Sequence, residues 1–195
     1  YFSYGHIIYR PEEAHLFGRC HVDRKSSMMG SDYSLAGTLE MARVTTLPIE
    51  KAARVSPGQG ISAMQVITAL EKDVLVPYQK RQVEEFKSGM QFIQSDRGGM
   101  VYQPKVGLHM DVAQVDFVSM YPAVIIKGNI SPEVPLPNVL EPAREELGVV
   151  PLTLKPLYEK RVSIKKKIRQ YPPDHPMVAI LKERANALKW LLVVC

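Results

Sequence analysis

Apolar residues recur at helical spacing in two stretches of the first third of the chain. One stretch is residues 33–44, where Ser31 or Asp32 is available as the N-cap, and the other is residues 61–73, which follow a turn at residues 56–60. We expect their apolar positions to lie in the core: Leu35, Leu39, Met41 and Val44 in the first, and Ile61, Met64, Ile67 and Leu70 in the second.

Two further helices are predicted toward the C-terminal end. Residues 156–170 and 176–195 both have helical patterns, and the break at residues 171–174 contains two prolines. A short connection of this kind joins antiparallel neighbours. We therefore expect a helical hairpin, preceded by a connecting stretch over residues 128–152 that holds five prolines.

The remaining pattern predicts β structure. A short extended region is expected at residues 21–23, and residues 111–118 are rich in β-branched side chains, which favours a buried strand. Pro122 then suits the first turn of a new helix. This unit places Asp116 where the strand ends and residues 119–121 at a helix N-terminus, where exposed N–H groups favour anions. The predicted fold class is α+β.

Composition narrows the function classes. Hydrophobic residues make up 46% of the 195 residues and charged residues 23%, as in a globular protein rather than a disordered one. No apolar run is long enough to span a membrane, and Cys20 and Cys195 show no disulfide or zinc spacing, so we expect a cytoplasmic protein. The five histidines lie too far apart for helical metal spacing.

The positive charge is concentrated near one end. Residues 151–195 hold 10 Lys and Arg against 3 Asp and Glu, whereas residues 1–150 hold 15 against 17. This favours a polyanionic partner such as nucleic acid or a nucleoside triphosphate, although a solvated helix face explains charge alone equally well. The chain begins without Met and ends in the apolar run of residues 190–195, so we expect a fragment of a longer polypeptide.

Residues 115–125, VDFVSMYPAVI, resemble motif A of the family B DNA polymerases, written D-F/L-x-S-L-Y-P-S-I. Other segments agree with that family in order and spacing. Residues 129–133 are similar to its N-V-S-P-D stretch, Gly98 and Gly99 to its Y-x-G-G motif, residues 159–167 to its first fingers helix, and residues 187–189 to the start of motif B. The resemblance covers residues 21–195 and points to a divergent archaeal or prokaryotic branch.

The resemblance implies a domain organisation and a function. It places the C-terminal part of an exonuclease-like domain at residues 1–75, a linker and partial palm at 76–148, and fingers helices at 149–195. The parent protein would carry out template-directed DNA synthesis, transferring a dNMP to a primer 3′-hydroxyl with two Mg²⁺ ions. Primer-template DNA and dNTPs are the implied partners. Whether a sliding clamp or another replication or repair factor binds stays open.

The resemblance also implies roles for the motif A residues. Asp116 becomes the catalytic carboxylate and a Mg²⁺ ligand, with the backbone carbonyl of Phe117 as a further ligand. Ser119, Met120 and Tyr121 would offer backbone N–H groups to the β- and γ-phosphates, and Tyr121 would stack under the sugar as a steric gate. Without the motif, a lone Asp at the end of a strand would be interpreted as a turn cap.

Three cations are candidates for triphosphate binding. Arg161 and Lys165 are four residues apart and share one helix face, and Lys189 comes from the antiparallel partner helix. They can therefore converge on one nucleotide, which the resemblance makes a dNTP. Gly98 and Gly99 are the implied DNA-binding residues.

Several departures from the family pattern leave alternatives open. Val193 stands where motif B has Asn, Asp96 where Y-x-G-G has Tyr, and Gly37 where the third exonuclease motif, Y-x-x-x-D, has its carboxylate. The Asp-Thr-Asp of motif C is absent, so we expect this chain alone to be inactive. The alternatives are a catalytically inactive polymerase relative that acts as a DNA-binding or scaffold subunit, and one half of a split polymerase.

Overall fold

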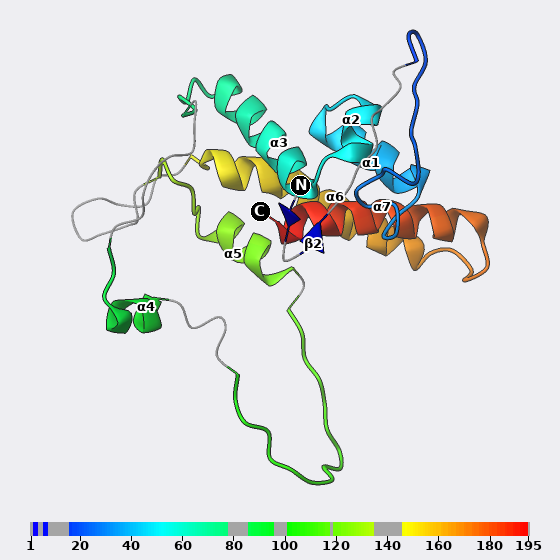
Figure 1. The fold of residues 1–195 in the computed structure, drawn as a ribbon. Helices are drawn as coiled ribbons and strands as arrows, with labels where there is room; N and C mark the ends of the chain where they lie inside the picture. Colours follow the sequence, from blue (N-terminus) through cyan, green and yellow to red (C-terminus); the bar gives the residue numbers. More distant parts are fainter. Residues whose placement is uncertain are drawn as a thin grey trace. The chain divides into compact units, whose positions relative to one another are not determined.

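The computed structural model describes residues 2–3, 6–7, 16–77, 86–95, 101–117, 119–134 and 146–194. These residues form seven helices and one antiparallel pair of two-residue strands, β1 (Phe2–Ser3) and β2 (His6–Ile7) (Figure 1). The chain divides into two units, one of residues 1–75 with 118–195 and one of residues 76–117. The predicted exonuclease-like, palm and fingers boundaries stay a prediction.

The first unit begins with three helices, α1 (Leu35–Thr45), α2 (Ile49–Arg54) and α3 (Pro57–Glu71). The helices expected at residues 33–44 and 61–73 are thereby confirmed. The expected turn at residues 56–60 is instead the first turn of α3, because the Ser56 side chain accepts a hydrogen bond from the Gln59 N–H at 3.4 Å and Pro57 occupies the first helical position. Helix α1 begins after Ser34 and not after Ser31 or Asp32.

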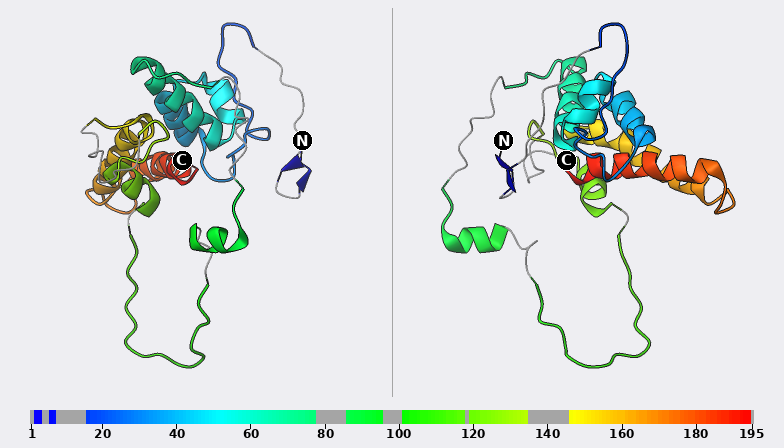
Figure 2. Two further views of the ribbon diagram at one scale, coloured as in Figure 1. Left: turned by 90° about the vertical axis from the view of Figure 1, so that its left-hand side faces the viewer. Right: turned by 45° about the vertical axis from the view of Figure 1, so that its right-hand side comes forward.

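The rest of this unit is α5 (Met120–Lys127), α6 (Val149–Ile168) and α7 (Pro176–Val193). Helices α6 and α7 lie side by side and antiparallel (Figures 1 and 2), so the predicted hairpin is confirmed. The predicted start of α6 at Pro156 is wrong. Side chains from residues 129–133 bond the N–H groups of residues 148–150, so the helix begins at Val149 and runs through the proline.

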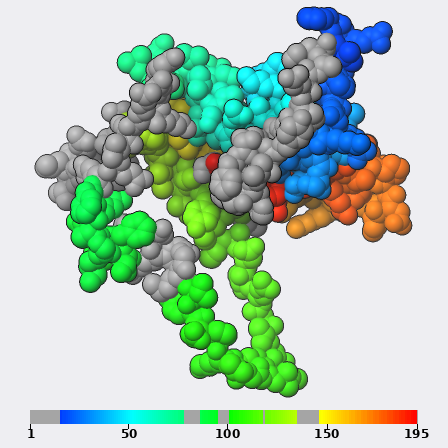
Figure 3. Space-filling model, viewed as in Figure 1, coloured from blue at the N-terminus to red at the C-terminus, as the bar shows by residue number. Residues whose placement is uncertain are grey.

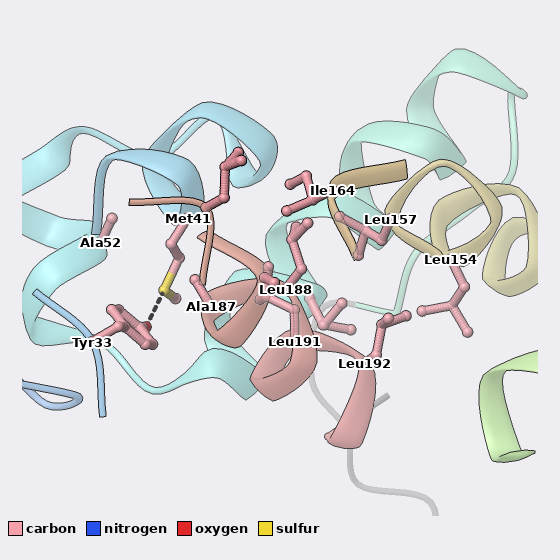
Figure 4. Close-up of a cluster of buried hydrophobic side chains, with 13 residues drawn as sticks. Tyr33, Met41, Ala52, Leu154, Leu157, Ile164, Ala187, Leu188, Leu191 and Leu192 are labelled. Carbon is pink, nitrogen blue, oxygen red and sulfur yellow. Dashed lines mark hydrogen bonds between the residues drawn. The ribbon is translucent and has the colours of Figure 1, made fainter. Parts of the chain in front are cut away.

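Helix α7 forms the centre of the core, because it packs against α1, α3, α5 and α6. The fully buried apolar side chains include Met41, Leu154, Leu157, Leu188 and Leu191 (Figure 4). Of the expected core positions, Met41 and Ile61 are buried and Val44 and Met64 pack against the cluster.

Three expected core positions, Leu35, Leu39 and Leu70, are exposed instead. The reason in α1 is that its buried face carries polar residues, Thr38, Glu40 and Thr45, which find partners inside. An apolar pattern therefore selects the wrong face of this helix.

The second unit contains α4 (Gly89–Ser95) and residues 101–117, which have no regular secondary structure. The strand predicted at residues 111–118 is therefore wrong for its described part, 111–117, and so is the one at residues 21–23. A β-branched segment needs a partner strand, and no strand in the described chain pairs with it. Asp111 also has a φ of 56°, outside the β region. The described residues are thus mainly helical, with β1 and β2 as their only strands, and the α+β domain description stays a prediction.

Side chains along residues 101–117 are exposed, as the thin, single-chain segment in Figure 3 indicates. Gly98 and Gly99 lie outside the described residues, as does Val118. No helix in the described part of the chain is both long and apolar enough to cross a membrane.

Candidate nucleotide-binding site

A cleft of about 400 Å³ lies along the α6–α7 hairpin and contains all three predicted cations. Arg161 and Lys165 reach it from α6, and Lys189 reaches it from α7. The remaining lining residues are Asp32, Ile168, Lys182, Glu183, Ala185 and Asn186. The three cations that helical spacing brought together in the sequence thus line one cleft in the structure.

Arg161 is held in place by a hydrogen bond and by partial burial. Its Nη1 donates a hydrogen bond to the Ser119 hydroxyl oxygen at 2.7 Å, and its Nε is buried without a hydrogen-bond partner among the described residues. Burial lowers the pKa of Arg161, but a guanidinium stays charged at any physiological pH. A partly buried cation that lines a cleft is suited to an anionic ligand.

Lys189 is the last residue of α7 that lines the cleft, and Trp190 follows it on the helix. Lys189 Nζ lies 5.6 Å from the centroid of the Trp190 ring, within cation–π range. The indole Nε1 of Trp190 is buried and has no hydrogen-bond partner in the described part of the chain. Because the sequence contains a single Trp, its fluorescence reports on the part of α7 that carries Lys189.

The N-terminus of α5 is joined to the cations through Ser119. Ser119 has a left-handed backbone, with φ 51° and ψ 57°, and it precedes the first helical residue, Met120. The Ala123 N–H bonds back to the Ser119 carbonyl at 3.0 Å, so the N–H groups of Met120 and Tyr121 have no intrahelical acceptor. Residues 119–121 thus begin a helix, as predicted, and the Tyr121 side chain is exposed.

Asp116 and Phe117 are in the other unit, at the end of the exposed segment. The structure describes each unit by itself, so it does not place these two residues against the cations. Among the described residues, no group of three or more His, Cys, Asp and Glu side chains is arranged to hold a metal ion. The metal-binding half of the predicted site therefore stays a prediction.

Sequence reasoning missed the acidic side of the cleft. The Ser34 hydroxyl donates to Glu183 Oε2 at 2.5 Å, and Asn186 Nδ2 donates to the Asp32 carbonyl at 2.5 Å. Residues 32–34 are thereby attached to α7. The spacing of Lys182, Asn186 and Lys189 on one helix could have indicated the α7 residues, but no local signal indicates Asp32.

A buried carboxylate connects α1 to the hairpin. The Glu40 side chain has no exposed surface and pairs with Lys160 of α6 at 2.6 Å and Arg184 of α7 at 2.8 Å. Burial by itself would raise the pKa of Glu40, but the hydrogen bonds and charges of Lys160 and Arg184 outweigh that effect and hold the pKa below 4.5. These ion pairs hold α6 and α7 against α1.

Gly37, the departure from the exonuclease motif, is set by packing. A Cβ atom at this position would lie 2.6 Å from the Tyr33 side chain, which is itself buried. An aspartate therefore cannot replace Gly37 unless Tyr33 moves.

Residues 59–141 match the family model described as DNA polymerase family B. The chain is also 29% identical over 171 residues to DNA polymerase 2 of Saccharolobus solfataricus. The chain is similar to family B DNA polymerases. It is 28% identical over 184 residues to DNA polymerase 2 of Aeropyrum pernix. The resemblance expected from motif A is thereby confirmed.

A solved structure supports the same relationship. The family B DNA polymerase from the hyperthermophilic archaeon Pyrobaculum calidifontis aligns with a TM-score of 0.55 and 29% identity, over 81% of this chain and 22% of that one. The two archaeal relatives are covered in the same way, over 84% and 87% of this chain but only 25% and 22% of their own lengths. The chain thus spans about a quarter of the length of the family B polymerases it matches.

Proposed function

We propose that the protein containing this chain is a DNA-directed DNA polymerase and that the chain supplies part of its dNTP-binding site. The observation that carries the proposal is the cleft in which Arg161, Lys165 and Lys189 meet. Its support is the similarity to archaeal polymerases over most of the chain.

The cations account for the triphosphate. Arg161 has a guanidinium that can bind two phosphate oxygens at once, while Lys165 and Lys189 provide mobile point charges. They would neutralise the charge that grows on the departing pyrophosphate. The backbone N–H groups at the start of α5 would bind the β- and γ-phosphates from the other side, and the exposed Tyr121 ring would lie under the sugar.

The carboxylate half of the site rests on Asp116. Nucleotide-bound Mg²⁺ takes oxygen ligands, commonly one or two carboxylates together with substrate phosphates, so the donor chemistry of Asp116 and the Phe117 carbonyl fits it. Two Mg²⁺ ions, when bound, would polarise the α-phosphate and the primer 3′-hydroxyl. The other partner, primer-template DNA, would contact Gly98 and Gly99.

Primer extension by the complete protein tests this proposal, with Mg²⁺ and dNTPs present. Asp116→Asn should abolish extension, because loss of a metal ligand costs orders of magnitude in rate. Asp111→Asn is the matched control, since Asp111 is exposed in the same segment and Asn tolerates its left-handed backbone. Extension that survives in Asp116→Asn would contradict the assigned role.

One departure favours a second candidate function. Val193, which replaces the motif B Asn, is exposed at the end of α7. A catalytically inactive, DNA-binding relative would show no extension by the wild-type complete protein and would bind DNA in a salt-dependent manner. Extension by wild type that depends on Asp116 would exclude it.

A further inference from the structure

Helix α6 begins without a capping side chain of its own. Its N-cap residue is Gly148, so its first N–H groups need acceptors from elsewhere. Three side chains from the segment after α5 provide them. Asn129 Oδ1 accepts from the Gly148 N–H at 2.8 Å, Glu133 Oε1 from the Val149 N–H at 2.5 Å, and Ser131 Oγ from the Val150 N–H at 3.1 Å.

Further contacts hold these three side chains in place. The Ser131 hydroxyl donates to Glu133 Oε2 at 2.7 Å, and Asn129 Nδ2 donates to the Glu146 carbonyl at 2.9 Å. Asn129 has a φ of 49°, a left-handed conformation that Asn tolerates better than most residues. A Cβ atom on Gly148 would lie 2.5 Å from the Ser131 Cβ, so a larger residue would push the cap apart. The cap therefore requires particular residues on both segments.

Helix α5 is consequently tied to α6 at both ends. At its N-terminus the Ser119 hydroxyl accepts a hydrogen bond from Arg161 at 2.7 Å, and just beyond its C-terminus the segment 129–133 caps α6. An eight-residue helix is only about 12 Å long, so two ties leave it little freedom to shift along α6.

We propose that Asn129, Ser131 and Glu133 are positioning residues that set the triphosphate affinity of the cleft. They fix the start of α5 at a constant position relative to Arg161 and Lys165. None of the three lines the cleft, so they act through α6 and not by contact with the ligand. The inference rests on the proposed function, since it concerns the same triphosphate site.

Titration of the 195-residue chain with Mg·dATP, followed by Trp190 fluorescence, tests the proposal. Glu133→Ala should weaken binding by about fivefold, because it removes the acceptor that caps the Val149 N–H at the start of α6. Glu159→Ala is the matched control, because Glu159 is exposed on α6 and its removal changes the charge equally; its affinity should change less than about twofold. Glu133→Gln keeps an oxygen acceptor for the Val149 N–H and should restore most of the affinity.

Combining Glu133→Ala with Arg161→Gln separates positioning from simple stabilisation. If the cap acts by placing α6 against α5, the double variant should lose less affinity than the product of the two single losses. Losses that multiply in the double variant would overturn the proposal, and so would wild-type affinity in Glu133→Ala. Circular dichroism at the assay temperature shows whether each variant is folded. If Glu133→Ala is not folded, Ser131→Ala carries the test, because it removes the acceptor for the Val150 N–H and should also weaken binding.

Failure of the wild-type chain to bind Mg·dATP would count against the proposed function, and hydrogen exchange then decides the positioning claim. Glu133→Ala should speed exchange at the Ala123 N–H, which bonds to the Ser119 carbonyl at the far end of α5, as well as at Val149. Faster exchange confined to α6 would overturn the claim.

Discussion

The cations proposed to bind the triphosphate and the carboxylate proposed to bind the metal differ in how firmly the surrounding structure holds them. The cations belong to a packed helical unit, where Arg161 is partly buried and bonded to Ser119. Asp116 belongs to a segment without regular secondary structure, and its side chain is exposed. Helix packing within this chain positions the cations. Among the described residues, no comparable packing surrounds Asp116. The residues proposed to bind the nucleotide thus lie in a packed helical unit, whereas the residue proposed to bind the metal lies in an exposed segment.

The largest expected difference between the two units is in stability. Leu188→Ala removes a fully buried side chain from α7 and should cost about 2–5 kcal/mol in the free energy of unfolding. Leu108→Ala is the same change at a residue that is 89% exposed, and it should cost less than about 0.5 kcal/mol. Urea denaturation followed by circular dichroism measures both. Similar losses for the two variants would mean that residues 101–117 are packed.

A smaller loss is expected from Glu40→Gln. It removes the charged partner that Lys160 and Arg184 share, but these keep 34% and 27% of their side-chain surface exposed. We expect about 2 kcal/mol, below the cost of breaking a fully buried pair. Glu71→Gln, at an exposed position of α3, is the control and should be neutral.

The same pair predicts a pH dependence. Because the folded pKa of Glu40 lies below 4.5, the unfolded state binds its proton first as the pH falls. The stabilisation is present above about pH 5 and is lost as the pH falls from 4.5 through the folded pKa. Wild type should therefore lose more stability on acidification than Glu40→Gln. Parallel curves for the two proteins would contradict the buried ion pair.

The smallest effect is expected at the acidic side of the cleft. Asp32→Asn removes a negative charge beside four cations and should tighten Mg·dATP binding about two- to threefold at low salt, with less effect at high salt. Asp73→Asn, at an exposed and left-handed position outside the cleft, is the control. Unchanged affinity in Asp32→Asn would mean that its carboxylate does not face the ligand.

The sequence predicted the features that depend on local spacing. Helical periodicity located the α6–α7 hairpin and the convergence of Arg161, Lys165 and Lys189, and Pro122 located the start of α5. Motif A supplied the family relationship that the comparisons confirm.

Features that depend on distant partners could not be predicted in the same way. The strand expected at residues 111–118 needs strands to pair with, and its composition says nothing about whether they are there. The start of α6 depends on side chains from residues 129–133, and the buried face of α1 depends on Lys160 and Arg184. Helical periodicity is a property of a single segment, so it gives no information on contacts between distant segments.

Titration with two nucleotides tests the central claim most directly. Trp190 fluorescence of the wild-type chain should report saturable binding of Mg·dATP, and dAMP should bind about tenfold more weakly or worse, because it lacks the β- and γ-phosphates. Arg161→Gln should remove most of this preference, since a charge-assisted hydrogen bond is worth about 1.5–3 kcal/mol. Equal affinity for the two nucleotides, or a preference that survives Arg161→Gln, would contradict a triphosphate site in the α6–α7 cleft.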